Sequence, residues 1–188
     1  MDAANNGSKI GLIKLICLAI AGLMVVTIGL VLVVAATKPD TFRLARSITV
    51  NAPPEKIAPF IEDFRQWALW SPFEKMGPME RSFSGADRGV GAHYAWVGDA
   101  KVGAGSMDIV AVTPTRIAID LKFTKPFETN NLAEFTLDPN GGVTVLTWAM
   151  SGPLTYLFKV VHTVFSMDNM VGPDFEAGLA SLKTLAEQ

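Results

Sequence analysis

Apolar and polar residues alternate in seven short segments between residues 42 and 150, a period of two that is typical of strands with one buried face. In one segment Ile117, Ile119 and Leu121 fall on the same side. Asp120 and Lys122 fall on the other side. The connections are short, whereas parallel strands need crossovers of about a dozen residues or more, so we expect an antiparallel sheet. The predicted strands are residues 42–50, 80–84, 90–97, 103–112, 116–123, 129–137 and 143–150.

A helical period follows the last predicted strand, from Tyr156 to Gln188. The apolar residues that recur on one face of this helix are Leu157, Val161, Val164, Val171, Phe175, Leu179 and Leu182. Burying each such side chain stabilises by about 1.5–3 kcal/mol, so we expect the sheet to wrap around this helix. Pro173 removes a backbone N–H, and we expect the helix either to kink there or to restart with Pro173 in its first turn.

A shorter helix is predicted between the first two strands. Pro53 and Pro54 suit a helix start, and apolar residues follow them at helical spacing. An aromatic turn comes next, with Trp67, Trp70 and Phe73. Such a tryptophan pair usually packs the corner between helices. The alternative is an exposed aromatic patch that binds another protein.

The N-terminal region contains a long uncharged segment. Residues 15–37 form 23 consecutive residues without charge, enough helix to cross a hydrocarbon core of about 30 Å. A secretory signal peptide is the alternative, with Val34-Ala35-Ala36 as cleavage site, but its apolar region would usually have only about 7–15 residues. We therefore expect a short tail at residues 1–14 and an uncleaved transmembrane helix at residues 15–37.

The charges beside this segment barely decide its orientation. Lys9 and Lys14 precede it, and Lys38, Arg43 and Arg46 follow it. Because Arg43 and Arg46 belong to a predicted strand, the balance slightly favours a cytoplasmic N-terminus.

Charge and cysteine content exclude several classes of function. The formal net charge is −2, and after Pro39 there remain 13 basic and 17 acidic residues, a net of −4. This balance argues against binding nucleic acid or docking on anionic lipid. Cys17 is the single cysteine and lies in the apolar segment, so a disulfide or a cysteine-based zinc site is excluded. The two histidines, His93 and His162, are too few for a histidine-based metal site.

No cofactor motif is present. Gly89-Val90-Gly91 and Gly103-Ala104-Gly105 lack the third glycine and the strand-turn-helix setting of a dinucleotide site. We expect these glycines to mark irregularities in a strongly curved sheet, and we expect no cofactor and no metal.

Several segments, in a fixed order along residues 42–187, resemble a known superfamily. They are Arg46-Ser47-Ile48-Thr49-Val50-Asn51-Ala52-Pro53-Pro54-Glu55-Lys56, Trp67 to Pro72, Tyr94-Ala95-Trp96, Thr147-Trp148, and Gly178-Leu179 with Leu182-Lys183. The chain resembles the START-like, helix-grip (SRPBCC) superfamily, and within it the bacterial polyketide cyclase/dehydrase and lipid transport-like branch. The resemblance implies an α+β helix-grip domain over residues 40–188, with a seven-stranded curved antiparallel sheet around the C-terminal helix and an apolar cavity between them. A bacterial protein of this kind would be anchored in the inner membrane by one helix. The branch has no universal catalytic signature to carry over.

The strand alternation predicts which side chains face such a cavity. The apolar candidates on the strands are Met107, Phe123, Phe135, Trp148 and Met150, and Met167 and Met170 lie on the helix that would close it. Each of them could instead simply fill the core. Asn131 shares a strand face with Ala133 and Phe135, so its amide is the best polar candidate for orienting a ligand.

Two residues are weak candidates for acid/base catalysis. Asp168 falls between Val164 and Val171 on the apolar helix face, where it would cap the helix or face the cavity. His93 alternates with Tyr94, so it should point away from that side chain. Glu128 and Asn130 lie in a turn between strands, where solvent exposure is the default.

The favoured hypothesis is a membrane-anchored START-like domain that binds a hydrophobic small molecule or lipid without chemistry. The alternatives are a cyclase- or dehydratase-like enzyme that uses a cavity acid/base, and a protein-interaction module. The sequence leaves the oligomeric state open.

Overall fold

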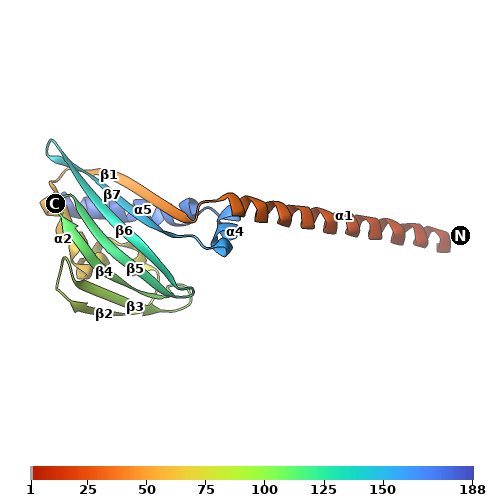
Figure 1. The fold of residues 1–188 in the computed structure, drawn as a ribbon, viewed down its shortest axis with the longest axis horizontal. Helices are drawn as coiled ribbons and strands as arrows, with labels where there is room; N and C mark the ends of the chain where they lie inside the picture. The colour runs from red at the N-terminus through yellow and green to blue at the C-terminus, as the bar shows by residue number, and fades with distance from the viewer. Residues whose placement is uncertain (1) are drawn as a thin grey trace. The chain divides into compact units, whose positions relative to one another are not determined.

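Seven antiparallel strands form one curved sheet in the computed structural model, which describes residues 2–188 of the chain (Figure 1). Their order across the sheet is β1-β7-β6-β5-β4-β3-β2, so every sequential pair from β2 to β7 is adjacent and β1 closes on β7. The strands are β1 (Thr41–Val50), β2 (Met79–Gly85), β3 (Ala92–Gly98), β4 (Ala104–Thr113), β5 (Arg116–Lys125), β6 (Thr129–Asn140) and β7 (Val143–Pro153). The predicted seven-stranded antiparallel sheet is confirmed.

The concave face of the sheet carries the core. On β5 the predicted inward residues Ile117 and Ile119 are fully buried, whereas Lys122 is exposed. The β4–β5 ladder shifts register at Ala104/Gly105, which confirms the expected irregularity at this glycine. A Cβ on Gly105 would collide with the Lys122 carbonyl and would lie 2.6 Å from the Trp96 ring, so only glycine allows this close approach.

The long helix α5 (Met167–Ala186) packs along the concave face of the sheet (Figure 1). Its buried side chains include Phe175, Leu179 and Leu182. The Phe175 ring stacks on Trp148 of β7 with centroids 4.0 Å apart and planes at 9°. A Cβ on Gly178 would lie 2.9 Å from the Trp148 ring, so this glycine lets the helix approach closely.

Four short helical segments join β1 to β2: α2 (Pro54–Glu62), η1 (Phe64–Gln66), α3 (Trp67–Trp70) and η2 (Pro72–Lys75). Trp67 donates its indole N–H to the Ile61 carbonyl at 3.0 Å, and Trp70 donates to the Phe60 carbonyl at 2.9 Å. Trp67 is buried and Trp70 is 0% exposed. The hypothesis of an exposed aromatic patch is therefore wrong, because both tryptophans pack the corner between helices and sheet.

The C-terminal helical run is two helices rather than one. A separate helix α4 (Tyr156–Val164) ends where Phe165 adopts an extended conformation, and α5 begins at Met167. The predicted restart at Pro173 is wrong, because α5 runs through this proline, and the alternative of a kink there stays a prediction. Gly172 precedes Pro173, and without a Cβ it has less to clash with the proline ring.

By its contacts the chain divides into two units: residues up to Pro39 with Thr155–Ser166, and Asp40–Leu154 with Met167–Gln188. In the first unit α1 (Asp2–Thr37) is one helix, and its segment Lys14–Thr37 is long and apolar enough to cross a membrane. The sequence pattern assigned α4 to the core of the sheet domain. The structure instead groups α4 with α1, and Leu157 and Val161 are exposed.

The N-terminal half of α5 is tied to β1 by two ion pairs. Arg46 contacts the Asp168 carboxylate at 2.9 Å and the Glu176 carboxylate at 2.7 Å. Asp168 is exposed at the protein surface and outside the cavity lining, so it does not face a cavity; its predicted role as a helix cap stays a prediction. Hydrogen bonding from Arg46 lowers the pKa of Asp168, and both acidic partners raise the pKa of Arg46.

We expect Asp168→Asn to lower the free energy of unfolding at pH 7, because it removes the charge that Arg46 binds. The folded-state pKa of Asp168 lies below its ordinary value of 3.8, so the stabilisation is present above that value. It is lost as the pH falls through the lower folded-state pKa. Urea unfolding of the full chain in detergent, followed by circular dichroism at pH 7 and pH 3, measures the difference.

Asp174→Asn is the matched control, because Asp174 lies on the same helix and forms no ion pair with any described residue. A deficit in Asp168→Asn that is as large at pH 3 as at pH 7 would contradict an origin in this ion pair.

Candidate ligand-binding site

A cavity of about 350 Å³ lies between the concave face of the sheet, the η2 segment and α5. All of its walls belong to the unit that contains the sheet. Its apolar lining consists of Trp67, Phe73, Met76, Met79, Trp96, Val102, Met107, Leu121, Phe123, Pro126, Ala133, Trp148, Met150, Val171 and Phe175. The polar side chains in the wall are those of Ser71, Glu74, Tyr94, Lys101 and Lys125.

The strand period places the aromatic wall. Tyr94 and Trp96 alternate on β3, both point to the concave side, and their rings stack with centroids 5.8 Å apart. The Trp96 ring meets Phe123 of β5 edge-on at 5.8 Å. These rings form a continuous apolar surface opposite α5, which gives the cavity a wall of fixed shape.

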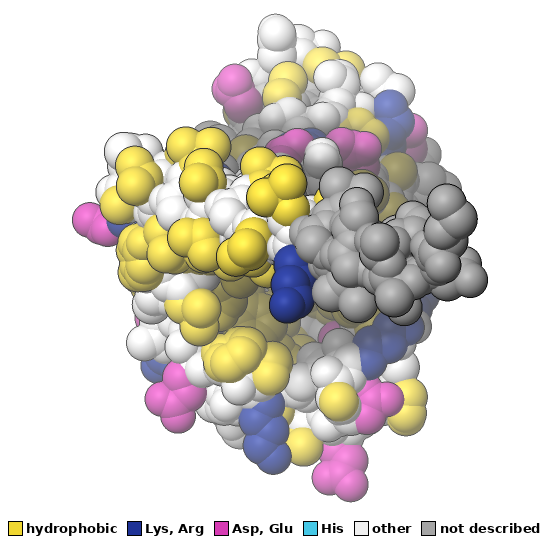
Figure 2. Space-filling model, turned by 90° about the vertical axis from the view of Figure 1, so that its right-hand side faces the viewer, with side chains coloured by type: hydrophobic (Ala, Val, Ile, Leu, Met, Phe, Trp, Pro, Cys, Tyr) yellow, Lys and Arg dark blue, Asp and Glu magenta, His cyan; other side chains and the backbone are white. Residues whose placement is uncertain are grey.

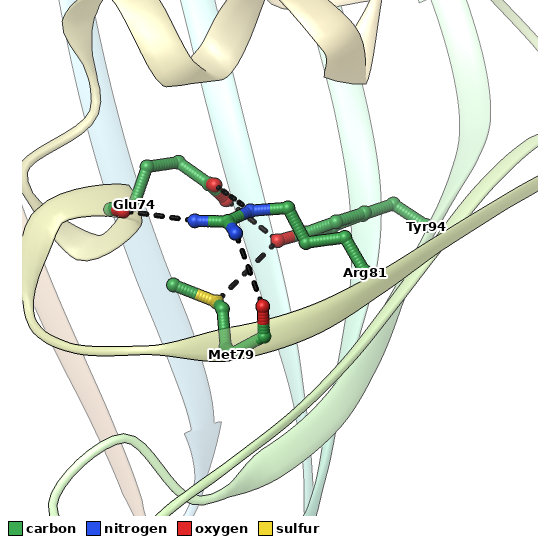
Figure 3. Close-up of polar contacts among 4 residues, drawn as sticks. All are labelled: Glu74, Met79, Arg81 and Tyr94. Atoms are coloured by element: carbon green, nitrogen blue, oxygen red, sulfur yellow. Dashed lines mark hydrogen bonds and ion pairs between the residues drawn. The ribbon is translucent and has the colours of Figure 1, made fainter.

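One charged cluster lies in this apolar wall (Figure 3). The Tyr94 hydroxyl donates to Glu74 Oε1 at 2.7 Å, and Arg81 Nε donates to Glu74 Oε2 at 2.7 Å. Arg81 also donates to the backbone carbonyls of Glu74 at 3.0 Å and Met79 at 3.2 Å. The cluster fastens η2 to β2 and β3, and both carboxylate oxygens of Glu74 are occupied.

The cluster shifts the titration of its members. Burial, followed by the hydrogen bond to Glu74, raises the pKa of Tyr94 well above its ordinary value. The hydrogen bond to Glu74 also raises the pKa of Arg81. At neutral pH the tyrosine is therefore neutral, and the guanidinium stays charged beside Glu74. The hydrogen bonds among Glu74, Arg81 and Tyr94 use the polar atoms of these side chains on one another. Such an arrangement favours a structural role in the cavity wall over a role in proton transfer.

Two further polar atoms belong to wall residues. Ser71 Oγ and the Trp148 indole nitrogen are buried without a hydrogen-bond partner among the described residues. Both atoms are sealed off from open space, so neither offers a ready contact to a ligand. The wall that a ligand meets is therefore almost wholly apolar.

The exposed members of the lining mark where the cavity reaches the surface. Lys101 lies in the turn before β4, and Lys125 ends β5. Both side chains are exposed, as are Met76 and Pro126. Neither lysine forms an ion pair with another described residue, so two lysine ammonium groups lie at the opening, with the Asp99 carboxylate in the same turn as Lys101.

Four of the eight residues predicted to contact a ligand line the cavity: Met107, Phe123, Trp148 and Met150. Phe135 does not, because it is fully buried and stacks on Trp148 at 5.2 Å, deeper in the core. Asn131 also lies outside the lining, and its amide donates to Thr129 Oγ1 at 3.3 Å. Alternation predicted the face of the sheet on which both residues lie but not their distance from the cavity.

The remaining predicted residues on α5 are also outside the cavity. Met170 is 64% exposed, and Met167 is only partly buried. Both belong to the first turn of α5, which precedes the part of the helix buried on the sheet from Gly172 onward. Asp168 in the same turn forms an ion pair with Arg46 and does not line the cavity, so it is not placed to act as an acid or base there.

His93 faces away from Tyr94, as predicted, and lies on the outer face of the sheet. Its Nδ1 contacts the Asp108 carboxylate at 2.7 Å. This position removes His93 as a cavity acid/base. Glu128, in the turn before β6, is exposed as expected; Asn130 is also exposed but lies in β6 rather than in the turn.

Sequence reasoning missed the Glu74–Arg81–Tyr94 cluster. Tyr94 carried a usable signal, since its alternation with His93 placed it on the concave side beside Trp96. Glu74 carried none, because it lies in a short helical turn whose course depends on Pro72 and on the packing of Phe73. Among the described residues, no group of three histidine, cysteine or acidic side chains is arranged to hold a metal ion.

We expect Tyr94 to ionise well above its ordinary pKa of 10.0. The chain has two tyrosines, so Tyr156→Phe leaves Tyr94 as the only phenol that ultraviolet absorbance detects. A raised folded-state pKa means that the stabilisation is complete below pH 10.0 and is lost as the pH rises above it. Urea unfolding at pH 9 and pH 11 measures that loss.

Tyr94→Phe is the control, because it should abolish the alkaline loss of stability. A phenolate signal near the ordinary value in the Tyr156→Phe chain would show that the Tyr94 hydroxyl is not buried against Glu74.

Comparison with known proteins identifies the family. The family model described as polyketide cyclase / dehydrase and lipid transport matches residues 41–187, nearly all of the chain after α1. No curated protein matches the chain.

Solved structures share the fold at low identity. Protein CV1439 from Chromobacterium violaceum is 20% identical, with a TM-score of 0.54 over 80% of this chain and 99% of that one. The Aha1 dimer from Colwellia psychrerythraea is 16% identical, with a TM-score of 0.52 over 78% of this chain and 96% of that one. The di-domain ARO/CYC BexL from the BE-7585A biosynthetic pathway is 15% identical, with a TM-score of 0.59 over 82% of this chain and 53% of that one.

The sheet, the helix that it wraps and the family match together show that this chain belongs to the polyketide cyclase/dehydrase and lipid transport family of the START-like superfamily.

Proposed function

We propose that the START-like domain binds a hydrophobic small molecule or lipid in the cavity between the sheet and α5, and that α1 anchors it in a membrane. The observation that carries this proposal is the cavity itself, about 350 Å³ with a nearly continuous apolar lining. Ligand sites are concave, mostly apolar and roughly 300–1,000 Å³ in volume. The family description, which includes lipid transport, supports the same class of ligand.

The charges of the wall favour a ligand with two different ends. Lys101 and Lys125 lie at the exposed part of the lining, and the interior side is aromatic and aliphatic. An apolar body would therefore occupy the interior, with a carboxylate or another acidic or polar group near the lysines. The Glu74 carboxylate in the interior part of the lining is paired with Arg81, so a ligand needs no positive charge to balance it.

The proposed membrane anchorage rests on the length and apolar character of helix α1. Its segment Lys14–Thr37 has 24 residues, a mean hydropathy of 2.9 and no buried residue in its most apolar window. A helix that exposes this much apolar surface is stable in a lipid bilayer and unfavourable in water. The anchor would hold the binding domain beside a source of lipid. A single span with a cytoplasmic N-terminus in a bacterial inner membrane remains our prediction.

A second candidate function is acid/base chemistry of the cyclase or dehydratase kind. The Glu74 carboxylate and the Tyr94 hydroxyl, 2.7 Å apart in the cavity wall, are the observation that favours it. Two observations disfavour this function. Arg81 donates a hydrogen bond to the Glu74 carboxylate and stabilises its charged form, and the raised pKa of Tyr94 makes the tyrosine a poor proton donor. We therefore place binding first.

We expect Val171→Trp to reduce ligand uptake roughly tenfold or more, a loss of about 1.4 kcal/mol in binding free energy, because the indole fills the cavity. Native mass spectrometry of residues 39–188, purified without detergent and incubated with a lipid extract, measures the bound fraction. A co-purifying hydrophobe would also give the mass of the ligand.

Val97→Trp is the matched control, because Val97 is exposed on the outer face of β3 and does not line the cavity. Equal uptake by both variants would place the ligand elsewhere, and a ligand-free mass for the wild-type chain after incubation would count against a carrier.

Tyr94→Phe separates binding from chemistry. We expect the hydrophobe recovered from the wild-type chain to have the same mass before and after incubation, and Tyr94→Phe to leave it equally unchanged. Liquid chromatography with mass spectrometry makes the comparison. Loss of the mass of one water with the wild-type chain but not with Tyr94→Phe would instead establish a dehydratase.

A further inference from the structure

Helix α4 carries an exposed apolar stripe. Leu157 is 64% exposed, Val161 is 40% exposed, and Phe165 at the end of the helix is 60% exposed. The spacing of four residues places Leu157 and Val161 on one side of the helix, and Phe165 follows in an extended conformation at its C-terminal end. Figure 2 shows hydrophobic side chains gathered on the left half of the face that it draws. Scattered apolar residues on a surface need no explanation, but an ordered stripe marks a contact face.

The polar residues of α4 point the opposite way. Lys159 is only 7% exposed, and its Nζ donates to the Lys38 carbonyl at 2.9 Å. The Lys38 ammonium in turn donates to the His162 carbonyl at 2.7 Å. A surface helix of a soluble protein buries its apolar side and exposes its polar side. This helix does the reverse, as expected where the surrounding medium is lipid.

The contact between α4 and α1 sets the depth of this helix. The Tyr156 hydroxyl donates to the Leu32 carbonyl at 3.0 Å, inside the apolar segment that ends at Thr37. Thr37 comes five residues after Leu32 along the helix, a rise of about 7.5 Å. Interfacial helices bury their apolar face by about 5–10 Å at the boundary of headgroups and acyl chains.

We propose that α4 is an interfacial helix that lies in the membrane surface from which α1 emerges, with Leu157, Val161 and Phe165 inserted among the acyl chains. The proposal rests on the membrane anchorage proposed above for α1. Tyr156 then occupies the headgroup level, where aromatic residues with a polar tip are enriched. Lys38 and Lys159 bond to backbone carbonyls of the same unit at this level, which anchors α4 to the end of the span.

The test uses the full chain in vesicles of phosphatidylcholine and phosphatidylglycerol. Cys17→Ala removes the native cysteine, and single cysteines are then introduced by Leu157→Cys or Val161→Cys and labelled with nitrobenzoxadiazole. Leu23→Cys, in the middle of α1, reports on the span. Val110→Cys, an exposed apolar position on β4, is the control in the sheet domain. Each label is exposed in turn to doxyl-labelled lipid and to aqueous iodide.

We expect doxyl groups placed near the headgroup to quench the labels at 157 and 161 by roughly twofold or more, because the apolar face of an interfacial helix lies at the boundary of headgroups and acyl chains. Iodide should have little effect on them, whereas it should quench the label at 110. Quenching at 23 by doxyl groups near the chain ends, combined with strong iodide quenching at 157 and 161, would overturn the interfacial helix and leave the anchor intact. Labels at 157 and 161 that neither quencher reaches would overturn it in favour of a protein-covered face, such as a second copy. Absence of lipid quenching at 23 would overturn the anchor, and this inference with it.

Discussion

The stacked pair of Trp148 and Phe175 is the contact on which the sheet domain depends. It joins the middle of β7 to the middle of α5 with ring centroids 4.0 Å apart, and Gly178 allows the helix that close. Trp70, Phe73 and Phe135 then pack around the Trp148 ring at 5.2–6.0 Å. Aromatic pairs contribute about 0.5–1.5 kcal/mol each beyond the area they bury. The contact therefore fixes the helix, the corner of short helices and the centre of the sheet in one cluster.

The same contact explains why a cavity remains beside the core. Helix α5 lies chiefly beside β1, the edge strand at which the strand order begins, and beside the short helices that follow β1 in the chain. The strands β3 and β4 lie toward the other side of the curved sheet, and the helix makes no extensive contact with them. Their inward side chains, including Trp96 and Met107, face open space that η2 only partly covers. The cavity is thus a consequence of one helix spanning a sheet that is wider than the helix.

Local patterns predicted much of this fold, and their failures have a common cause. Alternation identified all seven strands, and every one of them except the exposed edge strand β2 has one buried face. The helical period over Leu157 and Val161 was equally clear, but it reported only that one face of α4 is apolar and not what covers that face. Phe135 and Asn131 were placed on the correct side of the sheet, yet alternation does not measure depth. Glu74 meets Arg81 and Tyr94 only after the chain has turned through η2, so nothing local to it predicted the cluster.

The internal pairing of that cluster bears on which ligand the cavity suits. About ten water molecules would fit in 350 Å³. Glu74, Arg81 and Tyr94 bind one another, and the two unpartnered wall atoms, Ser71 Oγ and the Trp148 indole nitrogen, are sealed from the space. Water inside would therefore find few partners. Replacing such poorly bonded water by an apolar group is favourable, whereas a polar ligand would give up its own hydration for little return. Because the polar atoms of Glu74, Arg81 and Tyr94 already bond to one another, they leave few hydrogen bonds for water in the cavity, and this favours a hydrophobic ligand.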